Sequence, residues 1–325
     1  MKAILCKQFG EIESLVFEEI QSPIPTDNQV LIDVKACGVN FPDTLMVQGK
    51  YQFKPAFPFS PGGEVAGIVT AIGQNVKHLK VGYRVFSLTG HGGFAEEVLG
   101  EASKTFPMPP DMDFITAAST MYTYGTSYHA LKDRAKLKAG ETLLVLGAAG
   151  GVGLAAVQLA KLMGAKVIAA ASTSEKLTIC TQLGADEVIN YEIENIKDKI
   201  KELTQGKGVD VVYDAVGDRF TEPSIRSLAW KGRYLVVGFA AGEIPKIPLN
   251  LALLKGASII GVFWGMFAQN EPANSLQNFM DILGFIKEGK LKQHIHKIYP
   301  LAQAKDSLQD LADRKVMGKC VIDCT

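Results

Sequence analysis

The fold is decided by the stretch Leu143-Leu144-Val145-Leu146-Gly147-Ala148-Ala149-Gly150-Gly151-Val152-Gly153, which runs into a helix-like segment at residues 154–163. An apolar run of strand length, a glycine-rich turn and a helix thus follow one another. This order is the context in which a glycine pattern binds a dinucleotide. Backbone must approach a pyrophosphate closely there, so a Cβ at Gly150 or Gly151 would obstruct it, and Gly153 lets the helix pack tightly on the strand.

The same turn places free backbone amides at the start of the helix, where the helix dipole favours a phosphate charge. The pattern is AxGGxG rather than strict GxGxxG, because Ala148 holds the first position. A tight turn without a ligand has a similar sequence, but the strands and helices that follow favour a cofactor site. We therefore expect Ala149, Gly150, Gly151 and Val152 to contact a dinucleotide.

Strand-like and helix-like segments alternate beyond this turn. The further apolar runs of strand length lie at residues 167–171, 187–190, 209–213 and 234–237. Such alternation predicts βαβ units and a parallel sheet with helices on both faces. The runs are apolar throughout, as expected of strands that are buried on both faces.

The first third of the chain has a different character. Residues 30–36 and 64–72 are strand-like, and proline is dense across this third, which favours strands and irregular loops over long helices. Residues 274–287 and 302–313 are helix-like, and residues 319–323 form a closing strand. A length of 325 residues suits two domains.

Composition excludes several classes of function. The 34 basic and 34 acidic residues cancel, so no basic field attracts nucleic acid or a membrane surface. No apolar run is long enough to span a bilayer, and the N-terminal segment has no signal-peptide pattern. The five cysteines follow no zinc-finger spacing and suit a reducing compartment, so we expect a cytoplasmic protein.

The end of the second predicted strand distinguishes NADP from NAD. A NAD site usually carries an acidic residue there, to bind the ribose hydroxyl. Here the strand ends in Ala171-Ser172, and Lys176 follows. Hydroxyls and an ammonium suit a 2′-phosphate, and Tyr191 after the third strand can add a hydrogen bond. The adjacent Glu175 weakens the argument, but NADPH is the expected cofactor.

Several blocks in order resemble the zinc-free quinone oxidoreductases, relatives of zeta-crystallin within the medium-chain dehydrogenase/reductase superfamily. The resemblance covers essentially the whole chain. Its clearest blocks are Gly-Val-Asn-Phe-Pro-Asp at 38–43, Pro-Gly-Gly-Glu-Val-Ala-Gly at 61–67, Tyr-Gly-Thr at 124–126, the glycine turn at 147–153, Val-Tyr-Asp-Ala-Val-Gly at 212–217, Val-Gly-Phe at 237–239, Ile-Pro-Leu-Asn at 247–250 and Gly-Val-Phe-Trp-Gly at 261–265.

The resemblance implies an α/β fold in which a doubly wound parallel Rossmann sheet is inserted into a GroES-like β-rich catalytic domain. Residues 1–120 and 267–325 would form the catalytic domain, and residues 121–266 the Rossmann domain. By position it implies cofactor contacts at Tyr51, Thr126, Gly150, Gly151, Val152, Ser172, Lys176, Tyr191, Val216, Val237, Gly238, Phe239, Val262, Phe263, Trp264 and Lys319. Phe263 and Trp264 can equally be core aromatics of the last Rossmann strand.

The resemblance also bears on zinc. Zinc-dependent members of the superfamily have a Cys where this chain has Asn40 and a His where it has Gly63, and they carry a four-cysteine loop that is missing here. Glu64 alone cannot make a catalytic zinc site, which needs about three protein ligands. We therefore expect no bound metal and no Lewis acid to stabilise an alkoxide.

The remaining chemistry suits acceptors that delocalise negative charge. Quinones and α,β-unsaturated carbonyls accept a hydride readily, and hydrogen-bond donors can cover the developing oxyanion. Asn40 offers an amide, Tyr51 a phenol, and Asp43 can orient one of them. Two structural alternatives stay open: Asp43 as a turn or helix-cap carboxylate, and Asn40 as a buried amide that satisfies backbone groups.

Three functions remain open on this scaffold. The first is NADPH-dependent reduction of a small-molecule quinone or related conjugated carbonyl. The second is reduction of an enal, enone or enoyl thioester, and the third is nucleotide binding with little turnover. We also expect a homodimer, because the apolar strand at residues 257–264 should lie at the sheet edge and need covering.

Overall fold

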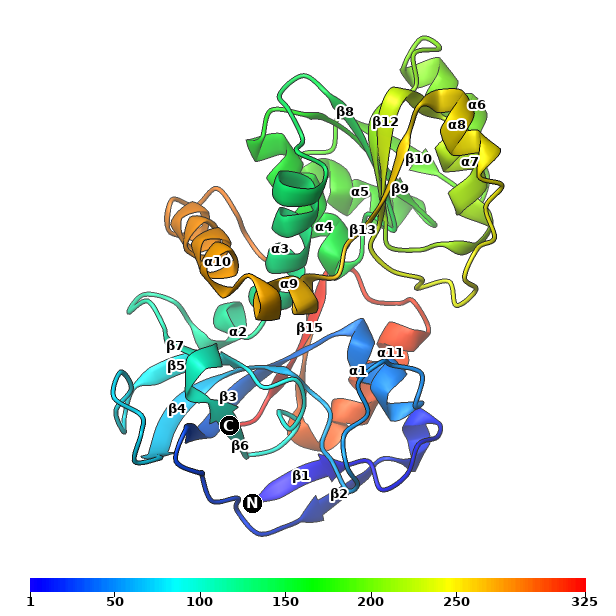
Figure 1. Cartoon of the computed structure of the whole chain (residues 1–325). Coiled ribbons are helices and arrows are strands. Elements are labelled where there is room, and N and C mark those ends of the chain that lie inside the picture. The colour runs from blue at the N-terminus through cyan, green and yellow to red at the C-terminus, as the bar shows by residue number, and fades with distance from the viewer. The chain divides into compact units, whose positions relative to one another are not determined.

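The computed structural model describes residues 1–325 and divides into two compact units, each built around its own hydrophobic core (Figure 1). The first unit combines Met1–Tyr122 with Ile295–Thr325, and the second is Thr123–His294. The second unit is therefore inserted between two stretches of the first.

The second unit is a six-stranded parallel sheet in the order β10-β9-β8-β11-β12-β13. Its strands are β8 Thr142–Leu146, β9 Lys166–Ala171, β10 Glu187–Asn190, β11 Val209–Asp214, β12 Leu228–Val236 and β13 Ser258–Gly261. The order reverses between β8 and β11, so the predicted doubly wound sheet is confirmed. In such sheets ligands bind at the carboxyl ends of the strands next to this reversal.

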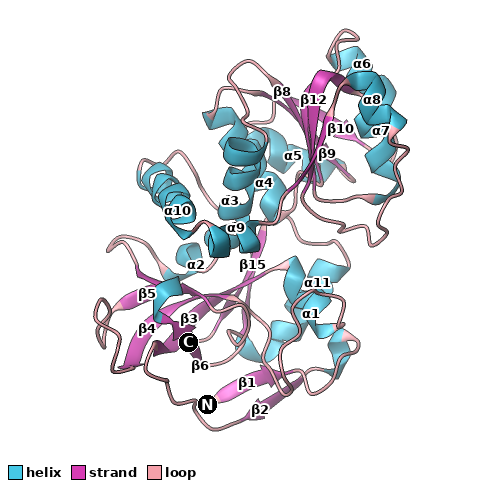
Figure 2. Ribbon diagram, viewed as in Figure 1, coloured by secondary structure: helices cyan, strands magenta, loops and turns pink.

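Helices cover both faces of this sheet (Figure 2). One core lies between the sheet and the side of α4 and α5, and the other between the sheet and the side of α6, α7 and α8. The helices of the unit are α4 Gly151–Leu162, α5 Ser174–Gln182, α6 Ile196–Leu203, α7 Thr221–Arg226, α8 Asn250–Lys255, α9 Trp264–Asn270, α10 Pro272–Lys287 and the π-helix η3 His129–Arg134. The central strands are apolar throughout because they are buried on both sides, as the sequence pattern predicts.

The first unit is a mainly antiparallel sheet in the order β14-β15-β3-β4-β5-β7, with β6 paired to β3. Its strands are β3 Gln29–Val39, β4 Glu64–Ile72, β5 Arg84–Leu88, β6 Glu97–Glu101, β7 Thr105–Pro107, β14 Ile295–Pro300 and β15 Lys319–Asp323, with a separate pair formed by β1 Lys2–Leu5 and β2 Val16–Glu19. The helices are α1 Phe41–Val47, α2 Phe114–Ala117 and α11 Ala304–Ala312, and α3 Met121–Tyr128 begins here and continues into the second unit. The late strand β15 lies inside the sheet, between β14 and the early strand β3.

The boundary between the units differs from the expected one at its second join. We expected the Rossmann part to end at residue 266, whereas the second compact unit continues to His294. Polar contacts explain the difference: Tyr128 donates a hydrogen bond to Asp281 (3.1 Å), and Lys132 donates one to Asn278 (2.9 Å). These bonds tie α10 to α3 and η3, so the helix belongs with the Rossmann part.

The last Rossmann strand is shorter than predicted. The expected strand covered residues 257–264, but β13 ends at Gly261 and Trp264 begins α9. Phe263 is 53% exposed, so it is not a core aromatic of a buried strand.

No helix of the chain combines the length and apolar character needed to cross a lipid bilayer.

Candidate functional site

The glycine turn between β8 and α4 is shaped for close approach of a ligand. Gly150 is the N-cap of α4, and no side chain caps the helix there. A Cβ on Gly153 would lie 2.3 Å from the carbonyl oxygen of Gly147, so this helix can pack on its strand only with glycine at that position. The amides of Gly151 and Val152 lie in the first turn, where helical residues have no intrahelical acceptor. The turn thus offers backbone donors and no obstructing side chain, which fits a pyrophosphate.

Predicted contacts from two other strands gather at the same edge of the sheet. The Asp214 carboxylate at the end of β11 accepts hydrogen bonds from the amides of Val216 (2.7 Å) and Gly217 (2.9 Å). The methyl groups of Val216 lie over Gly147, where an added Cβ would be 2.7 Å from Cγ2. The amide of Gly238 bonds to the Asp214 carbonyl (3.2 Å), and Val237 bonds there too.

The carboxyl end of β9 carries the residues predicted to recognise a 2′-phosphate. Lys176 Nζ lies 3.2 Å from Ser172 Oγ, so an ammonium and a hydroxyl stand side by side with no carboxylate at the strand tip. Thr173 caps α5 by accepting from the Lys176 amide (3.3 Å). Tyr191 follows β10 and packs on Phe220 with ring centroids 4.4 Å apart.

The remaining predicted contacts of the second unit lie on α3, after β12 and after β13. Gly125 of α3 packs against the indole of Trp264, and an added Cβ would be 2.8 Å from that ring. Ser127 Oγ donates to the Val152 carbonyl (2.8 Å), which brings Thr126 and its helix to the start of α4. Val262 bonds through its amide to the Val236 carbonyl (2.9 Å), and Phe239 lies against Gly217.

The first unit holds a buried polar cluster around Lys319. Its ammonium donates to the carbonyl of Val39 (3.0 Å), the amide oxygen of Asn40 (2.8 Å) and a carboxylate oxygen of Glu64 (3.2 Å). Lys319 is 4% and Glu64 1% exposed. Three acceptors match the three N–H donors of an ammonium, so Lys319 is fully bonded within this unit. We expected Lys319 to contact the cofactor, and sequence alone did not indicate this cluster.

The side-chain amide of Asn40 is also hydrogen-bonded to neighbouring groups. Its Nδ2 donates to the Gly38 carbonyl (3.3 Å) and to Glu64 (3.1 Å), while its oxygen accepts from Lys319. Of the two expectations for Asn40, this geometry corresponds to the buried amide that satisfies internal groups. An oxyanion would have to replace one of these bonds.

Asp43 lies in the first turn of α1 and ties this helix to the loop that contains Gly62. One carboxylate oxygen accepts a hydrogen bond from the backbone N–H of Asn40 (2.8 Å), and the other accepts one from the backbone N–H of Gly62 (3.2 Å). No cation pairs directly with it, and burial raises the pKa of Asp43 from its ordinary value to about 7, with Lys319 and the backbone bonds opposing the rise. The geometry is that of a helix-cap carboxylate whose charge is sensitive to pH near neutrality.

Two phenols lie in the electrostatic field of this carboxylate. Burial raises the pKa of Tyr51, and the negative charge of Asp43 raises it further. Burial also places the pKa of Tyr122 far above its ordinary range, and Asp43, Glu64 and Tyr51 add to this shift. Both phenols are therefore neutral donors at physiological pH. Tyr122, at the start of α3, was not recognised as a site residue from the sequence, because only the fold brings it here.

Position 63 has no room for a side chain. A Cβ on Gly63 would lie 2.7 Å from the Gly90 carbonyl and 2.8 Å from the Tyr122 hydroxyl. No group of three or more His, Cys, Asp or Glu side chains is arranged to hold a metal ion. The donor set at this place is instead an amide, a carboxylate and an ammonium.

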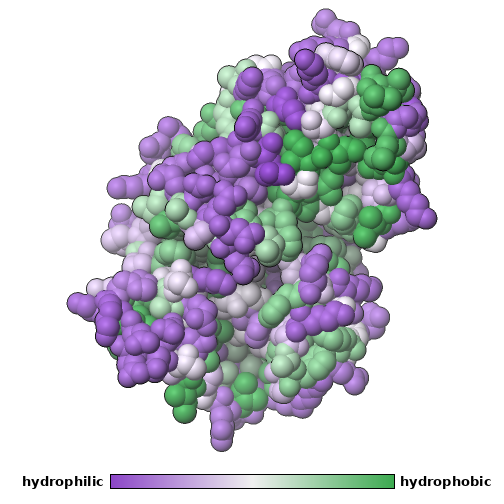
Figure 3. Space-filling view, in the orientation of Figure 1, coloured by the Kyte–Doolittle hydropathy of each residue, from purple (hydrophilic) through white to green (hydrophobic).

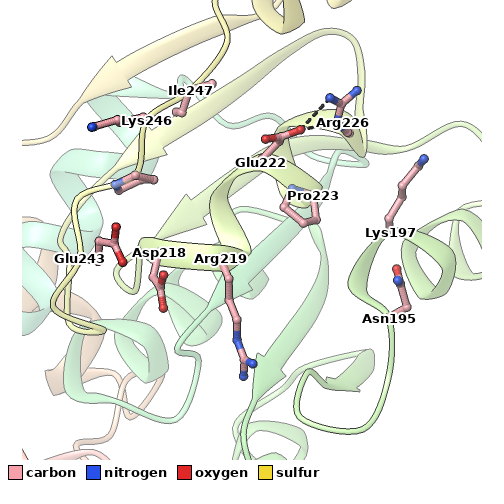
Figure 4. Close-up of a pocket in the computed structure, with 11 residues that line it drawn as sticks. Asn195, Lys197, Asp218, Arg219, Glu222, Pro223, Arg226, Glu243, Lys246 and Ile247 are labelled. Carbon is pink, nitrogen blue, oxygen red and sulfur yellow. Dashed lines mark hydrogen bonds and ion pairs between the residues drawn. The ribbon is translucent and has the colours of Figure 1, made fainter.

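A cavity of about 490 Å³ lies elsewhere in the second unit (Figure 4). Charged side chains from α7, the start of α6 and the segment 243–247 surround it, and Figure 4 shows Glu222 and Arg226 paired on α7 (2.6 Å). Arg219 pairs with Glu192 (2.8 Å). None of the predicted cofactor contacts lines this cavity, so it is distinct from the glycine-turn site.

Comparisons with known proteins cover the whole chain. Residues 151–281 match the zinc-binding dehydrogenase family model, and residues 26–110 match that of the alcohol dehydrogenase GroES-like domain. The quinone oxidoreductase-like protein 2 homolog of Nematostella vectensis is 41% identical over 329 residues, which cover 99% of this chain and 88% of that protein.

Solved structures are similar over the same extent. The quinone oxidoreductase of Escherichia coli, complexed with NADPH, is 30% identical with a TM-score of 0.93 and 100% coverage of both chains. The CurK enoyl reductase is 27% identical with a TM-score of 0.89, covering 99% of this chain and 98% of that one. The GroES-like match falls in the β-rich first unit, in agreement with the predicted fold class.

Proposed function

Because this chain belongs to the quinone oxidoreductase family of the medium-chain dehydrogenase/reductase superfamily, we propose that it reduces quinones or related conjugated carbonyls with NADPH and without zinc. The protein is an oxidoreductase. Bound NADPH would supply a hydride, and the acceptor takes one proton from a protein group or from water, so that a quinone leaves as its hydroquinone.

The observation that carries this proposal is the Asn40–Glu64–Lys319 cluster with its neighbour Gly63. The zinc-dependent relatives place a His at position 63, but here the Gly90 carbonyl and the Tyr122 hydroxyl occupy the space that a side chain would need. An ammonium already bonds to the one carboxylate that remains. Without a Lewis acid, acceptors that spread the developing charge over a conjugated system are the favoured substrates.

The fit to NADPH rests on the second unit. The uncapped start of α4 and the glycines at positions 150 and 151 suit a pyrophosphate. Ser172 and Lys176 together suit a 2′-phosphate, because an ammonium and a hydroxyl can both donate to its oxygens. The quinone oxidoreductase of Escherichia coli that was solved with NADPH supports the same cofactor.

On the acceptor side, Tyr51 is the phenol that we assign as donor to the developing oxyanion. It is half-buried, its hydroxyl is neutral, and it lies in the field of Asp43. Asp43 acts as a positioning residue, since both of its oxygens hold backbone amides. Asn40 contributes mainly by holding Glu64 and Lys319 in place.

The experiment that tests the function is NADPH oxidation by the purified protein with a panel of para-quinones, enals, enones and enoyl thioesters, each with and without a strong chelator. We expect turnover with quinones that the chelator leaves unchanged, and no stoichiometric zinc by elemental analysis. No turnover with any conjugated acceptor would reject the proposed reaction. Loss of activity with chelator, restored by zinc, would reject its independence of metal.

A second candidate is reduction of the carbon–carbon double bond of an enone or enoyl thioester. The CurK enoyl reductase shares the fold over nearly the whole chain, which supports this reaction as the alternative. The same panel separates the two reactions, because an enoyl reductase transfers the hydride to carbon and leaves the carbonyl in place. A preference for thioesters over quinones would favour this candidate.

For the assembly, we propose a homodimer through the edge of the parallel sheet. Strand β13 pairs only with β12, and hydrophobic residues gather over β13 and α8 (Figure 3). Leu253 and Leu254 are 79% and 69% exposed. A second copy related by a two-fold axis would cover this apolar edge.

All five cysteines are free thiols, which supports the proposal of a cytoplasmic location.

A further inference from the structure

His91 lies in a glycine loop that packs on the predicted site. Gly90 and Gly92 on either side have φ values of +80° and +100°, a left-handed backbone that favours glycine. The amide of Gly92 bonds to the Ser60 carbonyl (2.7 Å), and that of Gly93 bonds to the Gly62 carbonyl (2.7 Å). Since Gly62 also bonds to Asp43, the loop is anchored next to the buried cluster of the first unit.

Aromatic rings hold the imidazole in place. The ring of Phe53 stacks on it with centroids 6.0 Å apart and an interplanar angle of 25°, and Phe59 meets it edge-on at 6.2 Å. Phe53 lies two residues after Tyr51 and is 53% exposed, so part of its ring is open to a ligand. Burial lowers the pKa of His91, which keeps the ring neutral at physiological pH.

The imidazole has no hydrogen-bond partner within the chain. By contrast, His78 bonds to the Ala102 carbonyl (3.0 Å) and His129 bonds to Asp133 (2.8 Å). Neither nitrogen of His91 is among the fully buried unsatisfied atoms, so at least one remains reachable from outside. Two residues earlier in the same loop, Thr89 Oγ1 is buried without a partner. An unpaired, reachable imidazole beside an exposed aromatic face points to a ligand that carries acceptor atoms on a planar ring.

We propose that His91 donates its ring N–H to a carbonyl oxygen of the acceptor, at the end of the ring opposite to the oxygen bonded by Tyr51. This inference rests on the proposed function and deepens it, because it selects acceptors with two carbonyl groups on one planar ring. A para-quinone has that form, and its ring can stack on Phe53. An open-chain enal or enone has one carbonyl, which Tyr51 alone would bond.

The test compares His91→Phe, which keeps a ring between Phe53 and Phe59 but removes the donor, with His91→Gln, which keeps a donor. His78→Phe is the matched control, because it alters an imidazole elsewhere in the same unit. The values of kcat and KM are measured at saturating NADPH for a para-quinone and for an enone with a single carbonyl.

We expect His91→Phe to raise KM for the quinone about threefold to tenfold, the net effect of one neutral hydrogen bond, with little change in kcat. KM for the enone should stay at the wild-type value, and His91→Gln should recover most of the quinone affinity. Equal effects on both acceptors, or no effect on either, would overturn the proposed hydrogen bond.

A binding measurement separates this inference from the proposed function. If the wild type reduces no acceptor, the function fails, and calorimetry of quinone binding in the presence of NADP⁺ still tests His91. Weaker quinone binding by His91→Phe than by the wild type and His78→Phe, with equal unfolding midpoints, supports the assignment. Equal affinities, or no quinone binding by the wild type, overturn it.

Discussion

The ammonium of Lys319 lies 2.8 Å from the amide oxygen of Asn40, a residue 279 positions earlier in the chain. The same ammonium bonds to Glu64 (3.2 Å), and all three side chains are buried. A buried carboxylate without a cation is strongly unfavourable, so this contact ties the closing strand β15 to residues at the ends of β3 and β4.

Replacing Lys319 with Met should therefore destabilise the protein by about 3–5 kcal/mol, because Glu64 would be left buried without its cation. Chemical denaturation measures the change. Lys315→Met is the control, since Lys315 is exposed and its ion pairs contribute at most about 1 kcal/mol. If Lys319→Met instead weakens NADPH binding and leaves the unfolding free energy unchanged, the cofactor contact implied by the family resemblance is the correct role.

The cofactor preference should depend on Lys176. Its ammonium beside Ser172 is placed to bond a 2′-phosphate, and losing one charge-assisted bond costs about 1.5–3 kcal/mol, or roughly tenfold to a hundredfold in Kd. Fluorescence titration of Lys176→Ala should show this loss for NADPH and no change for NADH. Lys201→Ala on α6 should behave as wild type. Equal affinity of the wild type for both cofactors would contradict the prediction.

Tyr51 should matter more when charge is localised on one oxygen. Losing one donor in a dedicated oxyanion hole costs about 10²–10³ in rate. For Tyr51→Phe we expect a smaller loss with a quinone, whose charge is delocalised, and a larger loss with an enone. Steady-state rates with both acceptors measure the difference, and Tyr83→Phe, which alters an exposed phenol, is the control. Wild-type rates with every acceptor would restrict Tyr51 to shaping its surroundings.

Asp43 predicts a pH-dependent contribution to stability. Its pKa is about 7 in the folded protein and near its ordinary value in the unfolded chain. A raised pKa stabilises the fold fully below the unfolded value, near pH 4, and this contribution is lost as the pH rises to about 7. Asp43→Asn should therefore become more stable relative to wild type between about pH 4 and 7, and level off above.

Unfolding free energies measured across this range test the effect. The exposed carboxylate Asp111 provides a matched control through Asp111→Asn. Parallel pH profiles of the wild type and Asp43→Asn would show that Asp43 stays ionised throughout, contrary to the prediction.

The proposed dimer should dissociate when its sheet edge is made polar. Ile259 lies on β13 and is 39% exposed in one chain, so Ile259→Arg would place a charge in the interface. Sedimentation velocity at micromolar concentration should show a dimer for the wild type and a monomer for this variant. Ile193→Arg, an 81% exposed position after β10, should remain dimeric. A monomeric wild type would rule out the proposed assembly.

Local patterns predicted the Rossmann part well. Its strands are apolar throughout and its turns carry glycines, so the parallel sheet and the start of α4 could be inferred from neighbouring residues. The end of the last strand could not, because the apolar run continues through Phe263 while the chain turns into α9 at Trp264. Hydrophobicity alone does not distinguish a strand from an exposed apolar segment.

The polar cluster was less predictable for a physical reason. Asn40 follows β3, Glu64 begins β4 and Lys319 begins β15, and these strands meet only through tertiary pairing. No periodicity in the sequence indicates which of the three polar side chains bonds to which. The type of each residue suggested donors and acceptors, but not that the amide hydrogens of Asn40 are already bonded. His91 matched no sequence motif. Its candidate role comes from the neighbouring rings of Phe53 and Phe59 and from the glycine loop that holds it.

The position of β15 inside the first sheet also constrains how the protein is made. Glu64 leaves the ribosome 255 residues before Lys319, which at ordinary rates of translation is roughly ten to fifty seconds. During that interval the second unit can complete its sheet, whereas the first unit still lacks the strand between β14 and β3. The nascent first unit therefore holds an open strand edge and an unneutralised carboxylate until β15 is made, and an open edge can pair with another chain.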